Sequence, residues 1–183
     1  MAKIVVAEFV SVDGFISSPN GNMDGFSAQG DTSREMAELQ HGWGTLMMGR
    51  VAYEMIRFWA DAPVAGDPIA KFMNTVPKIV VSRSLTEAPW GKWTPARVVR
   101  DAGREIRAQR AHPGKDLAVL GSGQLVQYLA QRGLVDEYLL WIYPVAFGSG
   151  KAWVPARGLR LKLLGSRTFK SGIVEVRYRA TTQ

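Results

Sequence analysis

The amino-acid sequence predicts a three-layer α/β domain, in which a mostly parallel central sheet ends in antiparallel strands at its C-terminal edge. Short apolar runs alternate with segments of helical periodicity through most of the 183 residues. Several runs are continuously apolar, as in parallel strands that are buried on both faces. The last strand-like segments follow one another without a helix between them, which is typical of antiparallel strands. We expect a single domain over residues 1–183.

The N-terminal half supplies strand–turn–helix units and a core strand. Residues 4–10 are apolar apart from Glu8 and predict a buried strand. A β-branched run at residues 78–82 predicts another, and Pro68 suits the first turn of a short helix. In order, we expect a strand at 4–10, a turn at Asp13-Gly14, a loop at 17–22, a helix from Thr32 or Ser33 to about Gln40, a strand at 45–48, a helix at 51–59, a short helix at 68–73 and a strand at 78–82.

The C-terminal half continues with further strand–helix units and finishes with strands alone. Gly133 stands where a left-handed cap would end a helix, and Gly172 stands between two segments whose alternation predicts a hairpin. In order, we expect a loop at 88–95, a short strand at 97–100, a polar helix at 101–110, a strand at 117–120, a helix at 124–132, a strand at 137–143, a glycine loop at 144–151 and antiparallel strands at 159–166 and 173–178.

Composition narrows the functional classes. The chain carries 23 Lys and Arg against 16 Asp and Glu, a net charge of +7, but its arginines are scattered, so we expect no nucleic-acid partner. It contains no cysteine and only two histidines, so we expect no disulfide and no typical zinc site. No apolar stretch is long enough to span a bilayer, and the first strand-like segment is unlike a signal peptide. We therefore expect a cytoplasmic protein with no membrane partner.

Twice an apolar run ends at a glycine and a helix-like stretch follows at once. The first turn is Gly49-Arg50, and the second is Gly121-Ser122-Gly123. A helix N-terminus has unpaired N–H groups, and glycine lets an anion approach the backbone closely. Two such turns suggest a ligand with at least two phosphate positions, such as a dinucleotide. Taken alone, each turn is more often structural, and the second lacks the G-x-G-x-x-G spacing of an ordinary Rossmann domain.

Ser82-Arg83 lies at the end of the strand predicted at residues 78–82. The carboxyl ends of parallel strands are where open α/β sheets bind ligands. A hydroxyl and a guanidinium at that edge could hold a 2′-phosphate, which favours NADPH over NADH. The alternative is a loop made of common loop residues.

The order and spacing of these motifs resemble the dihydrofolate reductase superfamily, in particular the branch that contains the reductase domain of bifunctional riboflavin-biosynthesis enzymes. The resemblance extends over about residues 3–178. The segments that carry it are residues 12–16, 48–54, 80–83, 113–116, 119–123, 133–137 and 144–151.

This resemblance implies an NADPH cofactor that lies across the carboxyl ends of the strands. Ala52 stands where dihydrofolate reductases usually have a threonine, which removes one hydroxyl from the phosphate site. The resemblance implies phosphate contacts at Gly49, Arg50, Val51 and Ala52, pyrophosphate contacts at Gly121, Ser122, Gly123, Gln124 and Leu125, 2′-phosphate contacts at Ser82 and Arg83, and a nicotinamide-covering loop that contains Phe15 and Ile16.

The predicted function is therefore an NADPH-dependent reductase that transfers a hydride to a small heterocyclic substrate, pteridine- or aminopyrimidine-like, or to a carbonyl substrate. Dihydrofolate reductases bind the pterin ring through a buried acid on the first helix. Asp31, Glu35 and Glu38 offer no clear match to that acid. The sequence thus leaves the substrate open.

Hydride transfer also needs a proton source, and the candidates are Asp13, Glu8, Asp24 and Tyr143. Asp13 lies beside the predicted nicotinamide, but it is also an ordinary turn-former before Gly14. Glu8 lies in an apolar strand, where burial would raise its pKa and suit acid catalysis. The alternatives for Glu8 are a partner for a nearby arginine or an exposed edge position.

Two broader expectations concern partners and rival functions. The riboflavin-type relatives tend to pair through their late strands, so we expect a homodimer, and the apolar residues 139–142 lie in that region. The tryptophans either line a substrate pocket or belong to the core or an interface. The rival functions are a non-catalytic NADP(H)-binding sensor or scaffold of the same fold and, less in keeping with the scattered charges, a nucleic-acid binder.

Overall fold

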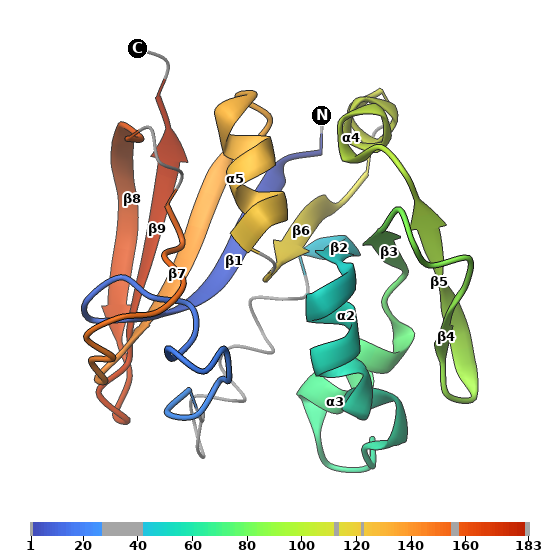
Figure 1. Cartoon of the computed structure of the whole chain (residues 1–183), viewed down its shortest axis with the longest axis horizontal. Helices are drawn as coiled ribbons and strands as arrows, with labels where there is room; N and C mark the ends of the chain where they lie inside the picture. The colour runs from blue at the N-terminus through green and yellow to red at the C-terminus, as the bar shows by residue number, and fades with distance from the viewer. Residues whose placement is uncertain (1, 27–41, 112–113, 122, 155–157, 182–183) are drawn as a thin grey trace.

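A computed structural model describes residues 2–26, 42–111, 114–121, 123–154 and 158–181 of the chain (Figure 1). No helix in these ranges is long and apolar enough to cross a membrane. In chain order the elements are β1 (Ile4–Ser11), β2 (Trp43–Gly49), α2 (Arg50–Ile56), a 3-10 helix (Arg57–Asp61), α3 (Pro68–Thr75), β3 (Lys78–Val81), β4 (Ala88–Trp90), β5 (Trp93–Val99), α4 (Ala102–Arg110), β6 (Asp116–Leu120), α5 (Gly123–Gln131), β7 (Glu137–Tyr143), β8 (Leu161–Thr168) and β9 (Val174–Ala180).

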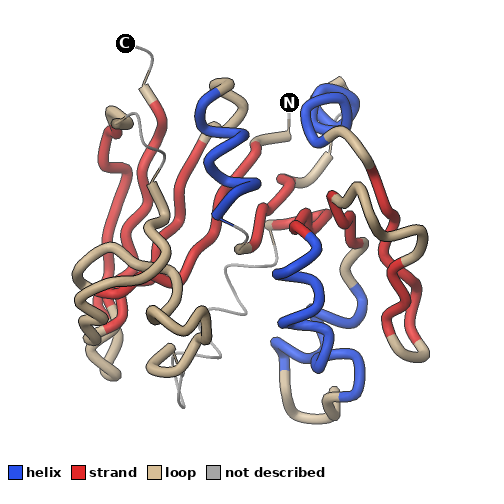
Figure 2. Tube along the Cα trace, viewed as in Figure 1, coloured by secondary structure: helices blue, strands red, loops and turns tan. Residues whose placement is uncertain are grey.

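The described strands form one sheet in the order β4-β5-β3-β2-β6-β1-β7-β9-β8 (Figure 2). Each pairing from β5 to β7 in this order is parallel. The pairings β7–β9 and β9–β8 are antiparallel, and so is β4–β5 at the opposite edge. The predicted mostly parallel sheet with antiparallel C-terminal strands is confirmed, with one more antiparallel pair than predicted.

Helices cover both faces of the sheet, because successive residues of a strand point to opposite sides. In β1, Val5 and Ala7 belong to one apolar core with Tyr53 of α2. Ile4 and Val6 belong to a second core, which also contains side chains of α4 and α5. The continuously apolar run of β1 thus fills two cores, which gives the three predicted layers.

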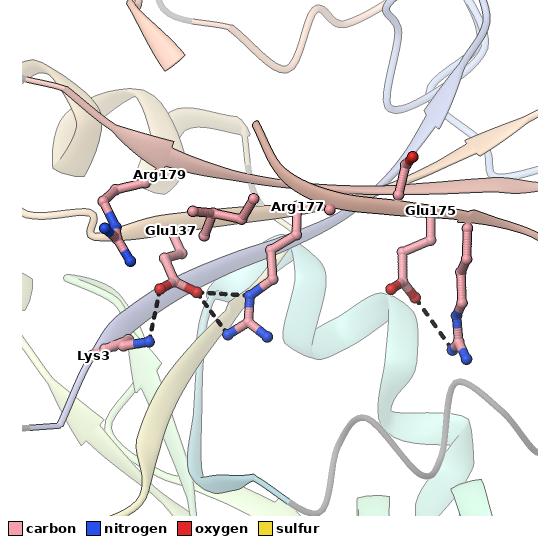
Figure 3. A pocket seen from close by; sticks show the side chains of 9 residues that line it. Lys3, Glu137, Glu175, Arg177 and Arg179 are labelled. Carbon is pink, nitrogen blue, oxygen red and sulfur yellow. Dashed lines mark hydrogen bonds and ion pairs between the residues drawn. The ribbon is translucent and has the colours of Figure 1, made fainter. Parts of the chain in front are cut away.

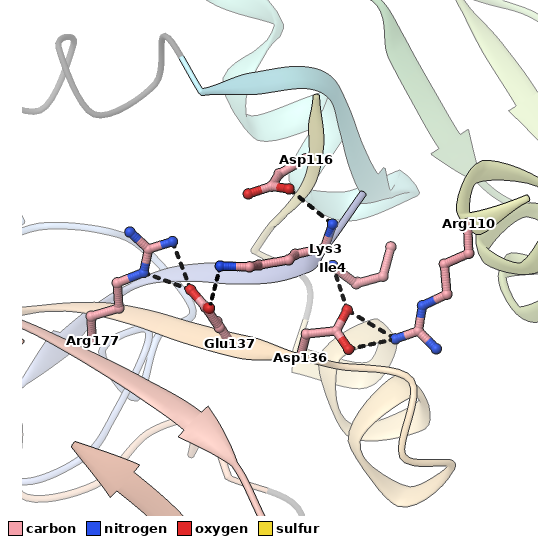
Figure 4. A network of polar contacts seen from close by, with 7 residues as sticks. All are labelled: Lys3, Ile4, Arg110, Asp116, Asp136, Glu137 and Arg177. Carbon is pink, nitrogen blue, oxygen red and sulfur yellow. Dashed lines mark hydrogen bonds and ion pairs between the residues drawn. The ribbon is translucent and has the colours of Figure 1, made fainter. Parts of the chain in front are cut away.

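A polar network fixes the amino-terminal ends of the central strands (Figure 4). The buried Glu137 carboxylate accepts hydrogen bonds from Lys3 Nζ at 2.8 Å and from Arg177 Nε at 2.7 Å. Asp136 accepts one from the Ile4 backbone N–H at 2.8 Å. These contacts join β1 to the start of β7 and to β9, so they hold the register of the central strand.

The loop predicted at residues 88–95 is wrong, because β4 and the start of β5 form an antiparallel hairpin there. Gly91 provides the turn with a φ of +54°. Trp90 is fully buried and donates its indole N–H to Asn74 Oδ1 at 2.7 Å. Pro89 is tolerated because β4 is an edge strand, where one side needs no backbone donor.

Other boundaries differ by a few residues. The helix predicted at 51–59 ends at Ile56 and continues as the 3-10 helix. The predicted helix from Thr32 or Ser33, with Asp31, Glu35 and Glu38, lies outside the described residues. Gly133 and Gly172 have φ of +62° and +84°, in keeping with the predicted cap and hairpin turn.

Candidate functional site

The strand order contains a topological switch point between β1 and β6. After β1 the chain passes to β2, on the β6 side of β1, whereas after β6 it passes through α5 to β7, on the other side. In open α/β sheets, ligands bind outside the carboxyl ends of the strands at such a point. We therefore expect a ligand-binding site at the carboxyl ends of β1 and β6.

At this switch point the two strands separate. The β1–β6 pairing ends at Ala7 and Leu120, whereas β1 stays paired with β7 as far as Ser11 and Tyr143. Glu8 is the first β1 residue beyond the last β6 partner. The end of β1 therefore lies beside the glycine turn that follows β6.

The two predicted glycine turns meet at the same place. Gly121 has a φ of +55°, and a Cβ built on it would lie 3.3 Å from the Cβ of Ala52 in α2. Gly123 opens α5, and a Cβ there would lie 3.1 Å from Ile16 Cδ1. The structure thus brings the turn after β2, the turn after β6 and the loop after β1 into direct proximity. Ser122 lies outside the described residues.

Arg50 and Val51 lie at the start of α2 and face solvent. The Arg50 guanidinium forms an ion pair with Glu54 at 2.9 Å, and both side chains are about half exposed. Gly49 precedes the helix in extended conformation, and no side chain caps the first turn. An exposed pair of this kind is weak, so it would not hold Arg50 strongly against a better anionic partner.

Ser82 and Arg83 follow β3, on the far side of β2 from β6. The Ser82 hydroxyl is buried and accepts hydrogen bonds from the backbone N–H groups of Ser84 at 3.2 Å and Leu85 at 3.1 Å. Arg83 is exposed, and Arg100 donates to the Ser82 carbonyl at 2.6 Å. Ser82 therefore shapes this turn, and the two guanidinium groups are the better anion ligands.

The remaining predicted cofactor contacts divide between surface and core. Gln124 is exposed on the first turn of α5, whereas Leu125 is buried beneath it. Phe15 is half-buried and forms a β-bridge with Ala152. The Ile16 backbone N–H donates to the Lys151 carbonyl at 2.8 Å. The loop after β1 is thus joined to the glycine loop after β7.

Asp13 anchors these two loops to each other. Its carboxylate accepts hydrogen bonds from the backbone N–H groups of Phe147 at 3.0 Å and Gly148 at 2.7 Å, and from the Ser11 hydroxyl. The Ser11 hydrogen bond, with those backbone bonds, lowers the pKa of Asp13. An ionised acceptor in this setting fits the role of a loop anchor better than that of a proton donor.

Glu8 has the opposite setting. It is 6% exposed, and its Oε1 has no hydrogen-bond partner among the described residues. Burial raises the pKa of Glu8 to about 8, and the charge of Lys151 opposes that rise. Of the alternatives left open by the sequence, the structure supports burial over an exposed edge, and it shows no arginine partner for Glu8 among the described residues.

Lys151 was missed by the sequence reasoning, which described residues 144–151 only as a loop. Its Cδ lies 3.3 Å from the position of a Cβ on Gly123, so its side chain passes over the start of α5. A lysine directly after the glycines of that loop was the available signal.

A hollow of about 380 Å³ lies elsewhere, over β7, β9 and β8 (Figure 3). Its two carboxylates already have partners, since Glu137 binds Lys3 and Arg177 while Glu175 binds Arg167 at 3.4 Å. Lys3 and Glu137 stand at the amino-terminal ends of their strands. The hollow is therefore separate from the switch point.

Comparison with known proteins identifies the family. Residues 2–175 match the RibD C-terminal domain family. The chain belongs to this family. A RibD C-terminal domain was the branch that the sequence motifs indicated, so that resemblance is confirmed.

Several proteins are similar to this RibD C-terminal domain in sequence or in fold. The uncharacterized protein YyaP of Bacillus subtilis (strain 168) is 29% identical over 96% of this chain and 94% of its own. A Shewanella sp. PV-4 protein named for riboflavin biosynthesis has a TM-score of 0.78 at 21% identity and is covered in full. The deaminase/5-amino-6-(5-phosphoribosylamino)uracil reductase of Thermotoga maritima has a TM-score of 0.71 at 12% identity, over 98% of this chain and 57% of its own. These likenesses show the fold.

Proposed function

We propose that this RibD C-terminal domain is an NADPH-dependent reductase whose cofactor lies across the carboxyl ends of β1, β2, β3 and β6. The observation that carries the proposal is the meeting of the Gly121 turn with Ala52 beside the switch point. Two turns at different edges of the sheet could not bind one dinucleotide. Here the turn after β6 lies so close to α2 that a Cβ on Gly121 would contact the Cβ of Ala52. Family membership supports the same conclusion, because the Thermotoga maritima relative is named as a reductase.

The residues at the site fit such a cofactor. A Cβ on Gly121 or Gly123 would be crowded by Ala52 or Ile16, so both positions favour glycine. Because glycine has no side chain, the backbone at these positions can approach a pyrophosphate closely. Arg83 and Arg100 place two cations at the turn after β3, which suits a 2′-phosphate. The bound cofactor would supply the hydride. The protein would supply orientation and a proton.

The substrate class that we propose is a small heterocycle of aminopyrimidine or pteridine type, or a carbonyl compound. The support for the aminopyrimidine comes from the name of the Thermotoga maritima relative. A substrate screen would use 5-amino-6-(5-phosphoribosylamino)uracil, dihydrofolate and an aromatic aldehyde, with NADPH oxidation as the readout.

Paired titrations of NADPH and NADH, followed by tryptophan fluorescence, test the cofactor site directly. We expect tighter binding of NADPH, and a loss of about tenfold in affinity, or roughly 1.4 kcal/mol, for Arg83→Ala. Arg179→Ala is the matched control, because it removes the same charge from an exposed side chain of β9. Binding of neither nucleotide would contradict the site. Binding without reduction of any probe would favour the non-catalytic sensor.

We also propose a homodimer, formed through the edge strand β8. Of the apolar residues of β7 that suggested pairing, Leu139, Leu140 and Trp141 are buried, and β7 lies between β1 and β9, so it has no free edge for an interface. β8 instead has an unpaired edge, and its Leu163 and Leu164 are 53% and 39% exposed. An edge strand of eight residues with two exposed leucines is suited to pairing with another chain.

A further inference from the structure

Glu8 occupies a special position in β1. Its Cα is paired with Leu140 of β7, but on the other side β6 has already ended at Leu120. Glu8 therefore stands directly beside the Gly121 turn, at the switch point where the proposed cofactor enters. A carboxyl group at this point lies at the edge of the sheet where we propose that the cofactor binds.

Among the described residues, Glu8 lies on a face of β1 whose core is mostly apolar. By strand alternation its side chain shares a face with Val6 and Val10, whose core also contains Leu140 of β7 and Val126 of α5. The titratable Tyr138 lies in that core too, and burial raises its pKa to about 12, so it is neutral. The charge that acts on Glu8 is that of Lys151.

A buried carboxyl group with an unused oxygen needs an explanation. Buried polar atoms in native proteins nearly always have hydrogen-bond partners, yet Glu8 Oε1 has none among the described residues. A buried acid whose pKa is strongly shifted and which lies at a ligand-binding edge of the sheet is typical of a catalytic group. Lys151 also has its side chain against Gly123 at the start of α5, and its charge acts on Glu8.

We propose that Glu8 is the proton donor of the reduction and that Lys151 is the positioning residue that stabilises its carboxylate afterwards. This inference rests on the proposed reductase function. The hydride adds to the electrophilic carbon of a C=O or C=N bond, and the π electron pair moves to the heteroatom. That heteroatom takes the proton as the Glu8 O–H bond breaks. Glu8 is left as a carboxylate near the Lys151 ammonium, and water returns the proton after the product leaves.

The first test needs no substrate. Dicyclohexylcarbodiimide labels protonated carboxyl groups in apolar sites, and mass spectrometry locates the label. We expect labelling of Glu8 at pH 7, loss of labelling as the pH rises through about 8, and protection by saturating NADPH. Glu87, which is exposed, is the internal control and should stay unlabelled. Absence of label on Glu8, or label that bound NADPH does not prevent, would overturn the proposal.

The second test distinguishes proton donation by Glu8 from binding of the cofactor. Glu8→Gln keeps the shape of the side chain, so we expect the NADPH dissociation constant to stay within about twofold of the wild-type value. The rate at which the variant reduces a probe that the wild-type chain reduces should fall about 100-fold. Lys151→Met should raise the pH midpoint of Glu8 labelling, and Lys151→Arg should restore it. Lys71→Met on the exposed face of α3 is the control.

These outcomes distinguish two failures. If the wild-type chain binds no NADPH or reduces no probe, the proposed function fails. If the wild-type chain does both and Glu8→Gln reduces the same probe at an equal rate, only the role of Glu8 is wrong.

Discussion

Lys78 is a cation that folding removes from water. It is 5% exposed, its Nζ donates to the Val76 carbonyl at 2.8 Å, and it lies 4.7 Å from the ring centroid of Trp90. Burial lowers the pKa of Lys78 to about 8. One hydrogen bond and one ring face compensate only part of the desolvation of an ammonium group.

We therefore predict that Lys78→Met raises the free energy of unfolding at pH 7 by about 1 kcal/mol. The unfolded lysine holds its proton to a pKa of about 10.4, so the wild-type stability rises with pH between about 8 and 10 and the advantage of the variant shrinks. Urea unfolding at pH 7 and pH 9 measures both effects. An advantage that grows with pH would contradict this account, and Lys71→Met serves as the exposed control.

Individual site residues were predictable only where their partners are local. Burial was one of the alternatives that the sequence left open for Glu8, because its neighbours in sequence are apolar. The role of Asp13 as an anchor depends on Phe147 N–H, 134 positions along the chain, which no local pattern reveals. Ser82 was predicted as a phosphate ligand, and the structure shows its hydroxyl engaged by the next turn.

The turn that opens α5 carries the most specific prediction about a secondary-structure element. A Cβ on Gly123 would lie 3.1 Å from Ile16 Cδ1 and 3.3 Å from Lys151 Cδ, so alanine there requires both side chains to shift by a few tenths of an ångström. We expect Gly123→Ala to weaken NADPH binding about tenfold, or roughly 1.4 kcal/mol, with a smaller effect on stability.

Fluorescence titration of NADPH beside thermal unfolding gives the two quantities. Gly158→Ala is the matched control, because a Cβ there meets nothing within 4 Å. Unchanged NADPH affinity in Gly123→Ala would show that this turn does not form part of the cofactor site.

Most helices and strands were predictable from periodicity and from their glycine and proline boundaries. The β4–β5 hairpin was not, because Pro89, Gly91 and Pro95 are typical of loops. What makes it a hairpin is the burial of Trp90 against Lys78 and Asn74, which belong to distant segments. Tertiary packing there overrides local preference.

The contacts around Glu137 hold strands from both ends of the chain together. Its side chain is 2% exposed, whereas those of Lys3 and Arg177 are 46% and 41% exposed. Burial alone would raise the pKa of Glu137, but the hydrogen bonds from Lys3 and Arg177 outweigh it and lower the pKa.

We predict that Glu137→Gln lowers the free energy of unfolding at pH 7 by about 2 kcal/mol, since it leaves two cations without their anion. A lowered carboxyl pKa stabilises the fold above the unfolded value, and this stabilisation disappears as the pH falls. The difference in the free energy of unfolding between wild type and variant should therefore be smaller at pH 4 than at pH 7, as measured by urea unfolding. If this difference is the same at both pH values, the loss of stability comes from packing and not from the charge of Glu137.

The proposed dimer makes a prediction about assembly. Sedimentation velocity should show a dimer for the wild-type chain and a monomer for Leu163→Lys with Leu164→Lys, because two charges on β8 would oppose pairing of the edges. Phe58→Lys changes a residue that is 59% exposed outside the sheet and should leave the dimer intact. A monomeric wild type would contradict the proposal.

The position of β1 has a consequence for how the chain folds as it is made. β1 is synthesised well before its two neighbours, β6 and β7, whose pairing contacts with Ile4 and Val5 begin at Leu117 and Glu137. A nascent chain that ends before residue 116 therefore has a strand of eight residues with both edges open. Such non-local pairing slows folding and prolongs exposure to other chains. β1, which lies between β6 and β7 in the finished sheet, thus stays without both of its pairing partners through much of translation.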